Sequence, residues 1–131
     1  MKKFIVVCAV IALILAAAVF EQIYTKNTFR GIEREIDAVS AAINAEKEHI
    51  DKENTIEIID GVIRKWDNRQ SKVFEIYLSH ILINEFGYKL KSLRAHVAQN
   101  DYDMADTDVA LIKENCRNLL EMNVPTLTNI F

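Results

Sequence analysis

Histidine side chains are the residues best suited to chemistry in this sequence, and three are present: His49, His80 and His96. Glu46 and His49 form a Glu-x-x-His step, whose spacing places a carboxylate and an imidazole on one face of a helix. A di-iron carboxylate centre needs two such steps and two further glutamates, and the sequence holds no second step. The pair is therefore interpreted as part of a solvated polar face, and no metal site is expected.

A polar group at helical spacing, formed by Tyr77, His80 and Asn84, is the second candidate site. Two interpretations stay open. The group holds a ligand or a proton, or it forms a hydrogen-bonded seam between helices, which is how buried polar side chains are usually satisfied. His96 follows Arg94 by two residues and is interpreted as a surface residue.

Trp66 is the third candidate, because a tryptophan flanked by "RK" and "DN" serves either as a core anchor or as an exposed binding residue. Its i, i+3 relation to Ile63 favours the core. Cys116 falls at helical spacing with Ile112 and Leu119 and is expected to be a small buried hydrophobe.

Catalytic and nucleic-acid-binding patterns are missing from the sequence. It contains no nucleophile elbow, P-loop, dinucleotide-binding fingerprint or zinc-ligand spacing, and its three glycines leave no Gly-rich loop to cradle a phosphate. After Phe20, fourteen Lys and Arg residues stand against nineteen Asp and Glu residues, a formal net charge of −5. Nucleic acid favours a basic surface instead. We therefore expect a non-enzymatic protein with no cofactor and no nucleic-acid partner.

The amino-terminal segment is the clearest targeting feature. Lys2 and Lys3 precede seventeen residues without a charge, Phe4 to Phe20. As a helix this run spans about 25 Å, against about 30 Å for a hydrocarbon core. Ala16 and Ala18 match the small residues of a signal-peptide cleavage site, but the apolar run continues past Ala18 and no helix breaker precedes it. We expect a retained membrane anchor, with cleavage as the open alternative.

The charges that flank this run predict its orientation. The positive-inside rule counts Lys and Arg residues close to the span. The short segment before the run is purely basic, whereas the other flank mixes Glu21 with Lys26 and Arg30. We expect a single-pass protein of the cell membrane, with the amino terminus in the cytoplasm and the remaining chain outside.

The scarcity of glycine and proline predicts an all-α chain, because turns and hairpins use these residues heavily. We assign residues 1–27 to the membrane anchor and residues 28–131 to an extracytoplasmic helical domain. Thr28 is expected to cap the first helix of that domain. Leu127, Ile130 and Phe131 are expected to fold back on the domain, because exposed apolar residues are unfavourable.

Apolar residues at steps of three and four divide the domain into helices. One apolar seam runs from Ile32 to Ile50, a second from Ile56 to Val97, and a third from Ala105 to Leu119. The second is read as one long central helix with a kink at 67–71, with two separate helices as the alternative. Short connections make neighbouring helices antiparallel. The sequence therefore predicts a transmembrane helix followed by a small antiparallel three-helix bundle.

Several stretches in the middle and at the end of the chain carry a family resemblance. They are "RKWDN" with Trp66, "FEIYLSHILINEF" with Ser79 and His80, "LKSLRAHVAQND", an alanine-containing final helix and the closing "NIF". Together they resemble an uncharacterised family of short bacterial proteins, largely from Gram-positive bacteria. The resemblance implies an amino-terminal membrane helix and a helical extracytoplasmic domain. It implies no catalytic residue, and it makes Trp66 and His80 the first residues to mutate.

The expected function is that of a membrane-anchored, non-enzymatic helical protein that interacts with an envelope protein partner or with itself. The alternative is an extracytoplasmic ligand-binding or sensing module with Tyr77, His80 and Asn84 in its pocket. A continuous apolar patch on the bundle surface would favour a protein partner. A buried polar pocket at His80 would favour ligand binding.

Overall fold

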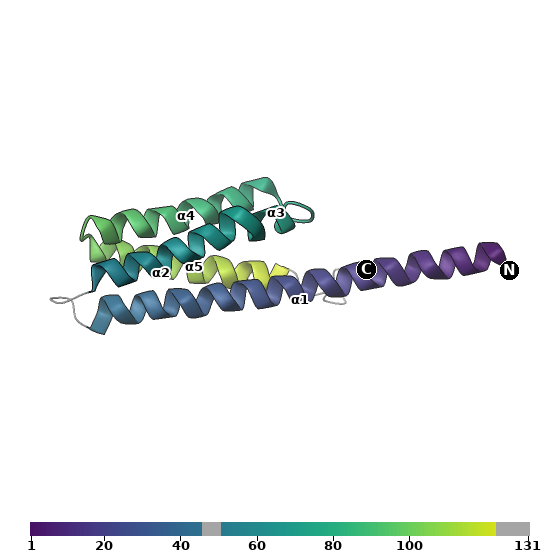
Figure 1. Cartoon of the computed structure of the whole chain (residues 1–131), viewed down its shortest axis with the longest axis horizontal. Coiled ribbons are helices and arrows are strands. Elements are labelled where there is room, and N and C mark those ends of the chain that lie inside the picture. The colour runs from purple at the N-terminus through teal and green to yellow at the C-terminus, as the bar shows by residue number, and fades with distance from the viewer. Residues whose placement is uncertain (46–50, 123–131) are drawn as a thin grey trace.

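The described part of the chain, residues 1–45 and 51–122 of a computed structural model, is helical and contains no strand. This confirms the predicted all-α class for these ranges. The Glu46 and His49 pair and the carboxyl-terminal Leu127, Ile130 and Phe131 lie outside them. Figure 1 shows α1 (Lys2–Ala45), α2 (Lys52–Lys65), a π-helical segment η1 (Trp66–Gln70), α3 (Ser71–Phe74), α4 (His80–Ala98) and α5 (Tyr102–Met122).

α1 is one helix of 44 residues whose two parts have different surroundings. Its amino-terminal part extends beyond all the other helices (Figure 1) and contains an 18-residue window with a mean hydropathy of 2.9, none of it buried. This part is long and apolar enough to cross a membrane, a test that a signal sequence also passes. The second part buries one stripe at helical spacing: Thr25, Phe29, Ile32, Ile36, Val39 and Ile43.

The predicted helix start at Thr28 is wrong, because α1 passes through this position without a break. Residues 21–28 contain no glycine or proline to interrupt the helix. The boundary that we placed between residues 27 and 28 therefore lies inside one rigid element. The apolar segment and the bundle share a single helix instead of being joined by a linker.

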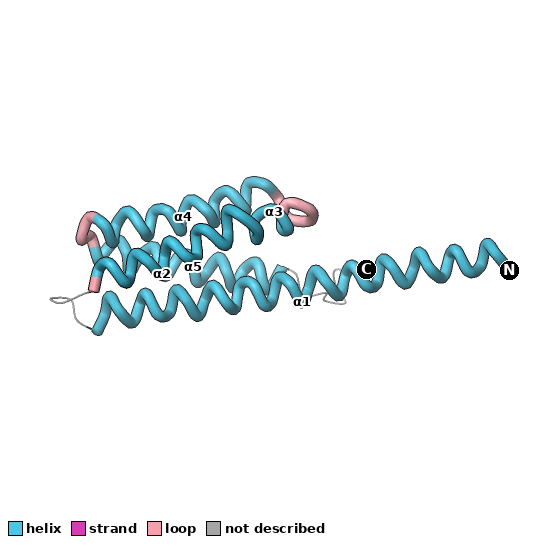
Figure 2. The backbone as a smooth tube through the Cα atoms, in the orientation of Figure 1, coloured by secondary structure: helices cyan, strands magenta, loops and turns pink. Residues whose placement is uncertain are grey.

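The bundle of the described residues has four members where three were predicted: the second part of α1, then α2, α4 and α5. α1 packs against α2 and α5, and α4 packs against the same two helices. Successive members run in opposite directions and are joined at the ends of the bundle (Figure 2). Each buries its apolar stripe against two neighbours, as amphipathic helices in an up-and-down bundle do.

The predicted single central helix is wrong and the alternative of two separate helices is observed, with the break later in the chain than the predicted kink. The chain turns at residues 75–79, between α3 and α4. Inward-facing positions recur every four residues from Trp66 to Leu90, and each such step rotates about 40° on a helix with 3.6 residues per turn. One straight α-helix cannot bury such a drifting stripe. The turn resets it, and Ser79 then caps α4 by accepting a hydrogen bond from the Ile81 N–H at 3.2 Å.

The segment in which a kink was predicted is instead a π-helical turn. The Ser71 N–H donates a hydrogen bond to the Trp66 carbonyl five residues earlier. This wider turn allows Trp66, Gln70 and Phe74 to be buried at successive steps of four. π-helical turns are rare and are frequent at functional sites. Here the turn brings the Gln70 side chain inward, beside α1.

Aromatic rings fill the half of the bundle nearest the exposed part of α1. The ring centroids of Trp66 and Phe86 are 4.6 Å apart, and those of Phe29 and Phe74 are 5.0 Å apart. Gly87 of α4 makes room for the indole, because a Cβ atom at this position would lie 3.1 Å from Trp66 Nε1. Large buried rings contribute much of the burial in a small core, so this cluster fixes how α1, η1 and α4 meet.

Candidate functional site

The four predicted site residues do not form one site. Trp66 is 2% exposed and belongs to the aromatic cluster, as its core interpretation requires. Tyr77 is half-buried on the turn before α4, where its hydroxyl lies 2.9 Å from Thr25 Oγ1 of α1. His80 and Asn84 are exposed on α4. The polar seam predicted for Tyr77, His80 and Asn84 is therefore not formed, because the tyrosine bonds to α1 while the other two side chains are exposed.

The Tyr77 phenol acts as a neutral hydrogen-bonding group. Burial raises its pKa, an effect opposed by the hydrogen bond to Thr25 and reinforced by the negative charge of Glu21. The phenol therefore stays protonated at neutral pH. Its contact with Thr25 ties the turn before α4 to α1, at the end of the bundle where α1 leaves it.

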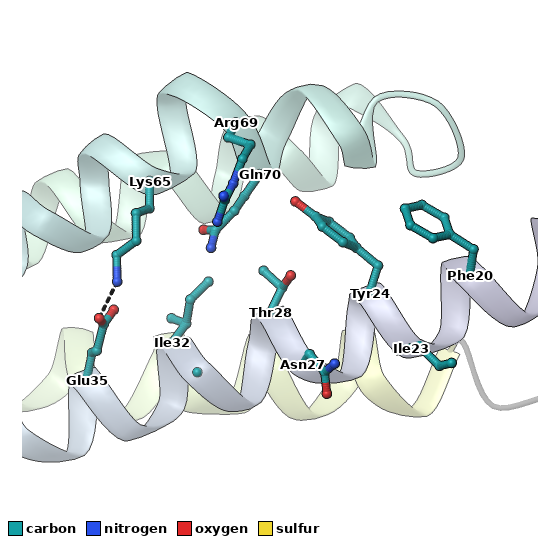
Figure 3. A pocket seen from close by; sticks show the side chains of 11 residues that line it. Phe20, Ile23, Tyr24, Asn27, Thr28, Ile32, Glu35, Lys65, Arg69 and Gln70 are labelled. Carbon is teal, nitrogen blue, oxygen red and sulfur yellow. Dashed lines mark hydrogen bonds and ion pairs between the residues drawn. The ribbon is translucent and has the colours of Figure 1, made fainter.

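A groove lined by polar and apolar side chains separates α1 from the end of α2 and η1 (Figure 3). It has a volume of about 400 Å³. One wall is the face of α1 from Phe20 to Glu35, and the other holds Arg69 and Gln70 of η1. Gly31 keeps the floor open, since a Cβ atom there would meet nothing within 4 Å.

Two buried polar atoms in this groove have no hydrogen-bond partner among the described residues: Gln70 Oε1 and the Tyr24 hydroxyl. Gln70 is only 8% exposed. Figure 3 shows Arg69 and Gln70 pointing from η1 toward α1, and Tyr24 and Thr28 pointing from α1 toward η1. An unsatisfied buried polar group costs about 1–3 kcal/mol. The groove therefore offers an unused acceptor and an unused hydroxyl to a ligand.

The charge in and around the groove is mainly positive. Glu35 is the one carboxylate among the lining residues, and it forms an ion pair with Lys65 across the groove (Figure 3). Arg69 has no carboxylate within ion-pair distance in the part of the chain that the structure describes. Arg30 and Arg34 are exposed on α1 and do not line the groove, and Glu21 follows the lining residue Phe20. An anion entering the groove would meet one unpaired guanidinium group, that of Arg69.

A second polar cluster joins α4 to α5 at the other end of the bundle. His96 Nδ1 lies 2.5 Å from Asp108 Oδ2, and Ser92 Oγ donates to the same oxygen at 3.1 Å. Asp108 is 6% exposed, so the surface interpretation of His96 is wrong: the ring is half-buried against this carboxylate. A nucleophilic triad places histidine between serine and carboxylate. Here the carboxylate lies between the other two side chains, so the cluster is not arranged as a nucleophilic triad. It is a structural hydrogen-bonded link between α4 and α5.

The other chemistry-bearing residues are isolated. Cys116 is fully buried, as predicted, and burial raises its pKa to about 12, with a smaller contribution from Glu33. Cys8 is exposed on the apolar part of α1. Within residues 1–45 and 51–122, no three His, Cys, Asp or Glu side chains come close enough to hold a metal ion.

Sequence reasoning missed the groove because its walls come from segments some forty residues apart. The "DNRQS" stretch, residues 67–71, was interpreted as a kink. One signal was available: Gln70 continues the step of four between Trp66 and Phe74. A polar residue at an inward-facing position is informative, because buried positions are usually apolar.

Comparison with known proteins gives one match. A family model described as a domain of unknown function (DUF4363) matches residues 19–130. This range contains all the helices of the bundle and both walls of the groove. No curated protein and no solved structure matches the chain.

Proposed function

The chain belongs to the family described as Domain of unknown function (DUF4363). This family is uncharacterised, as the resemblance implied, and we therefore propose a function from the structure. We propose a membrane-anchored, non-enzymatic helical protein that binds an envelope protein partner or a second copy of itself. The observation that supports it is the continuity of α1 from the exposed apolar part into the bundle. A partner bound to such a bundle is held at the membrane surface.

Retention of the apolar segment is favoured by the residues at the junction. Phe20 and Ile23 are 57% and 55% exposed. Tyr24 stacks on Phe20 with ring centroids 5.7 Å apart and packs on Phe74 at 5.4 Å. A chain cut after Ala18 would leave Phe20 and Ile23 in water at the very end of a helix. Within a membrane interface the same side chains are well solvated, because aromatic residues favour that layer.

The proposed orientation places Lys2 and Lys3 in the cytoplasm and the bundle outside, following the positive-inside rule. Single cysteines in a Cys8→Ser, Cys116→Ala background test it in intact cells. A membrane-impermeant maleimide should label Asn118→Cys, since Asn118 is exposed on α5. It should leave a cysteine inserted between Met1 and Lys2, with both lysines kept, unlabelled until the cells are opened. The reverse pattern would contradict the orientation.

The partner-binding surface is proposed to be the outer face of α4 and the turn before it. Ile76, Ile81 and Tyr88 are 79%, 71% and 75% exposed, and Ile81 and Tyr88 lie two turns apart on one side of α4. Exposed apolar groups rimmed by polar residues mark interaction surfaces, and tyrosine is enriched in such interfaces. The buried Trp66 belongs to the core, so it is a poor probe of partner binding.

A photo-crosslinking residue in place of Tyr88, in the full chain in its own membrane, tests this surface. We expect one defined crosslinked product, either with another envelope protein or with a second copy. Ile81→Asp should weaken it on the order of tenfold, as loss of an interface anchor does. The same crosslinker in place of exposed Glu114 on α5 is the control. Equal products from both positions, or none from Tyr88, would contradict the proposal.

The alternative function is a ligand-binding module, and the groove favours it where the predicted pocket does not. Tyr77, His80 and Asn84 do not line a common pocket. The groove with its unpaired Gln70 Oε1 does offer a binding site, and the chemistry of that groove indicates a ligand class.

A further inference from the structure

We propose that the groove between α1 and η1 binds the headgroup of an anionic phospholipid whose headgroup carries a hydroxyl group. This inference rests on the proposed membrane anchoring of α1. It adds a lipid ligand to the protein partner proposed above. Three features of the groove lead to it: its depth relative to the membrane, its charge and its unpaired polar atoms.

The groove begins where the apolar part of α1 ends. Phe20 and Ile23 line its first part, and Phe20 is the last residue of the uncharged run. At about 1.5 Å per residue, Tyr24 lies about 6 Å beyond Phe20 along α1, and Thr28 about 12 Å. The headgroup layer extends about 5–7 Å beyond the hydrocarbon core on each side. The polar part of the groove therefore starts within the headgroup layer at Tyr24 and extends above that layer at Thr28. A lipid that binds here keeps an acyl chain against Phe20 and Ile23 and extends its headgroup upward along the groove toward Arg69 and Gln70.

The charge of the groove suits a phosphate diester. The Arg69 guanidinium points into it and has no carboxylate partner among the described residues. Guanidinium groups bind phosphate oxygens in a bidentate way, with charge-assisted hydrogen bonds. Lys65 neutralises Glu35, which leaves Arg69 as the net positive charge of the lining residues. A zwitterionic or cationic headgroup would gain less from this arrangement.

The unpaired polar atoms select the rest of the headgroup. The Tyr24 hydroxyl can donate to a phosphate oxygen. Gln70 Oε1 is an acceptor and needs a donor, which a phosphate diester does not supply. A headgroup hydroxyl supplies it, whereas a choline group has no hydrogen-bond donor. Phosphatidylglycerol combines the negative phosphate with such hydroxyls, and it is therefore the probe.

The test uses the full chain in nanodiscs of equimolar phosphatidylglycerol and phosphatidylcholine. The protein is then released into a neutral detergent, and the lipids that stay bound are identified by native mass spectrometry. We expect phosphatidylglycerol to be retained about tenfold over phosphatidylcholine, as charge-assisted hydrogen bonds allow. Arg69→Gln should reduce this preference about tenfold. Arg64→Gln, an exposed arginine of α2 outside the groove, should leave it within about twofold.

Two further variants test the hydroxyl and the open floor. With phosphatidylmethanol, an anionic lipid without a headgroup hydroxyl, the wild-type chain should bind several-fold more weakly than with phosphatidylglycerol, and Gln70→Leu should remove that difference. Gly31→Leu should fill the groove and abolish retention. Gly61→Leu of α2 is its control, because Gly61 also has nothing within 4 Å of a Cβ atom and does not line the groove.

Three results would overturn the inference: equal retention of both lipids, equal losses in Arg69→Gln and Arg64→Gln, or displacement of the lipid by millimolar glycerophosphate. The last result would mean that a free phosphate ester suffices and that the apolar end of the groove adds nothing. An intact, membrane-bound chain without lipid preference removes this inference and leaves the proposed function standing. A chain recovered without its apolar segment removes both.

Discussion

At the scale of single residues, four polar side chains are buried in the described part of the bundle, and all but one are paired; the Tyr24 hydroxyl, a buried atom of a half-buried side chain, also lacks a partner. Thr25 contacts Tyr77, Thr55 Oγ1 donates to the Asp51 carbonyl at 2.9 Å, and Asp108 accepts from α4. Gln70 is the exception, with an Oε1 that lacks a partner among the described residues. A helical protein that keeps such a group at a π-helical turn carries a cost in folding that a bound ligand can offset.

Gln70→Leu should therefore stabilise the chain when no lipid is bound. An apolar side chain of similar size removes the unsatisfied acceptor, and we expect the free energy of unfolding to rise by up to about 1 kcal/mol. Thr55→Val is the matched control, because it removes a hydroxyl that is hydrogen-bonded and should lower stability by about 1 kcal/mol. Urea unfolding in a neutral detergent measures both. A loss for Gln70→Leu as large as that for Thr55→Val would show that the Gln70 amide is satisfied.

The Cys116 thiol should make stability depend on alkaline pH. Burial raises its pKa to about 12, whereas in the unfolded chain it ionises near its ordinary value. The folded state thus binds one more proton between these two pKa values, so stability is unaffected at neutral pH and falls as pH rises above about 9. Cys116→Ala removes this effect, and its cost relative to wild type should shrink by about 2 kcal/mol between pH 8 and about 10.5. Urea midpoints at both pH values measure it, and parallel losses in the two proteins would contradict the prediction.

At the scale of elements, close contact between helices is set by small residues at a few positions. Gly87 of α4 faces the Trp66 indole at a distance that leaves little space for a methyl group, whereas Gly61 of α2 faces open space. Both are helix-interior glycines, and alanine is favoured over glycine there by about 1 kcal/mol. Alanine substitutions at the two positions therefore distinguish the effect of helix propensity from the effect of packing against Trp66.

Gly61→Ala should raise the free energy of unfolding by up to about 1 kcal/mol. Gly87→Ala should give no such gain and should lower stability by about 1 kcal/mol or more, because the indole is held by Phe29, Phe74 and Phe86 and cannot easily move. Thermal unfolding followed by circular dichroism compares the two. Equal stabilisation by both substitutions would mean that α4 does not press on Trp66.

The contact between α4 and α5 allows a second comparison. In a double-mutant cycle, His96→Ala and Asp108→Ala should show a coupling energy of about 1.5–3 kcal/mol, as hydrogen bonds to a largely buried carboxylate do. The Lys113 and Asp37 pair, whose nitrogen and oxygen atoms are 2.6 Å apart but whose side chains are 39% and 55% exposed, should couple by about 0–1 kcal/mol. Equal coupling energies for the two pairs would contradict the structural role of His96.

At the scale of the whole molecule, the sequence predicted the helical class, the apolar amino-terminal segment and the stripe of α5. These follow directly from unbroken apolar runs and from steps of three and four. The number of bundle members could not be predicted in the same way. Leu78 and Leu82 continue the step of four across the turn at residues 75–79, so the spacing shows that the stripe drifts but does not locate the break.

The candidate site was harder to predict than the fold, for a physical reason. Tyr77, His80 and Asn84 share a helical spacing in the sequence, but Tyr77 precedes the start of α4 and follows a different local geometry. The groove arises only when η1 packs beside α1, and neither wall has a distinctive motif of its own. Spacing shows which residues share a face of one helix, but it does not show which residues of the neighbouring helix contact that face.

The mass of the mature protein in the membrane fraction shows whether α1 anchors the bundle as one uncut helix. We expect the membrane fraction to contain the chain with its apolar segment, and we expect that high salt and alkaline carbonate do not release it. Ala18→Leu, which removes the small residue before the alternative cleavage point, should leave the mass changed only by the substitution itself. Recovery of a chain that begins at Val19, in a form that carbonate releases, would show that α1 is cut and does not anchor the bundle.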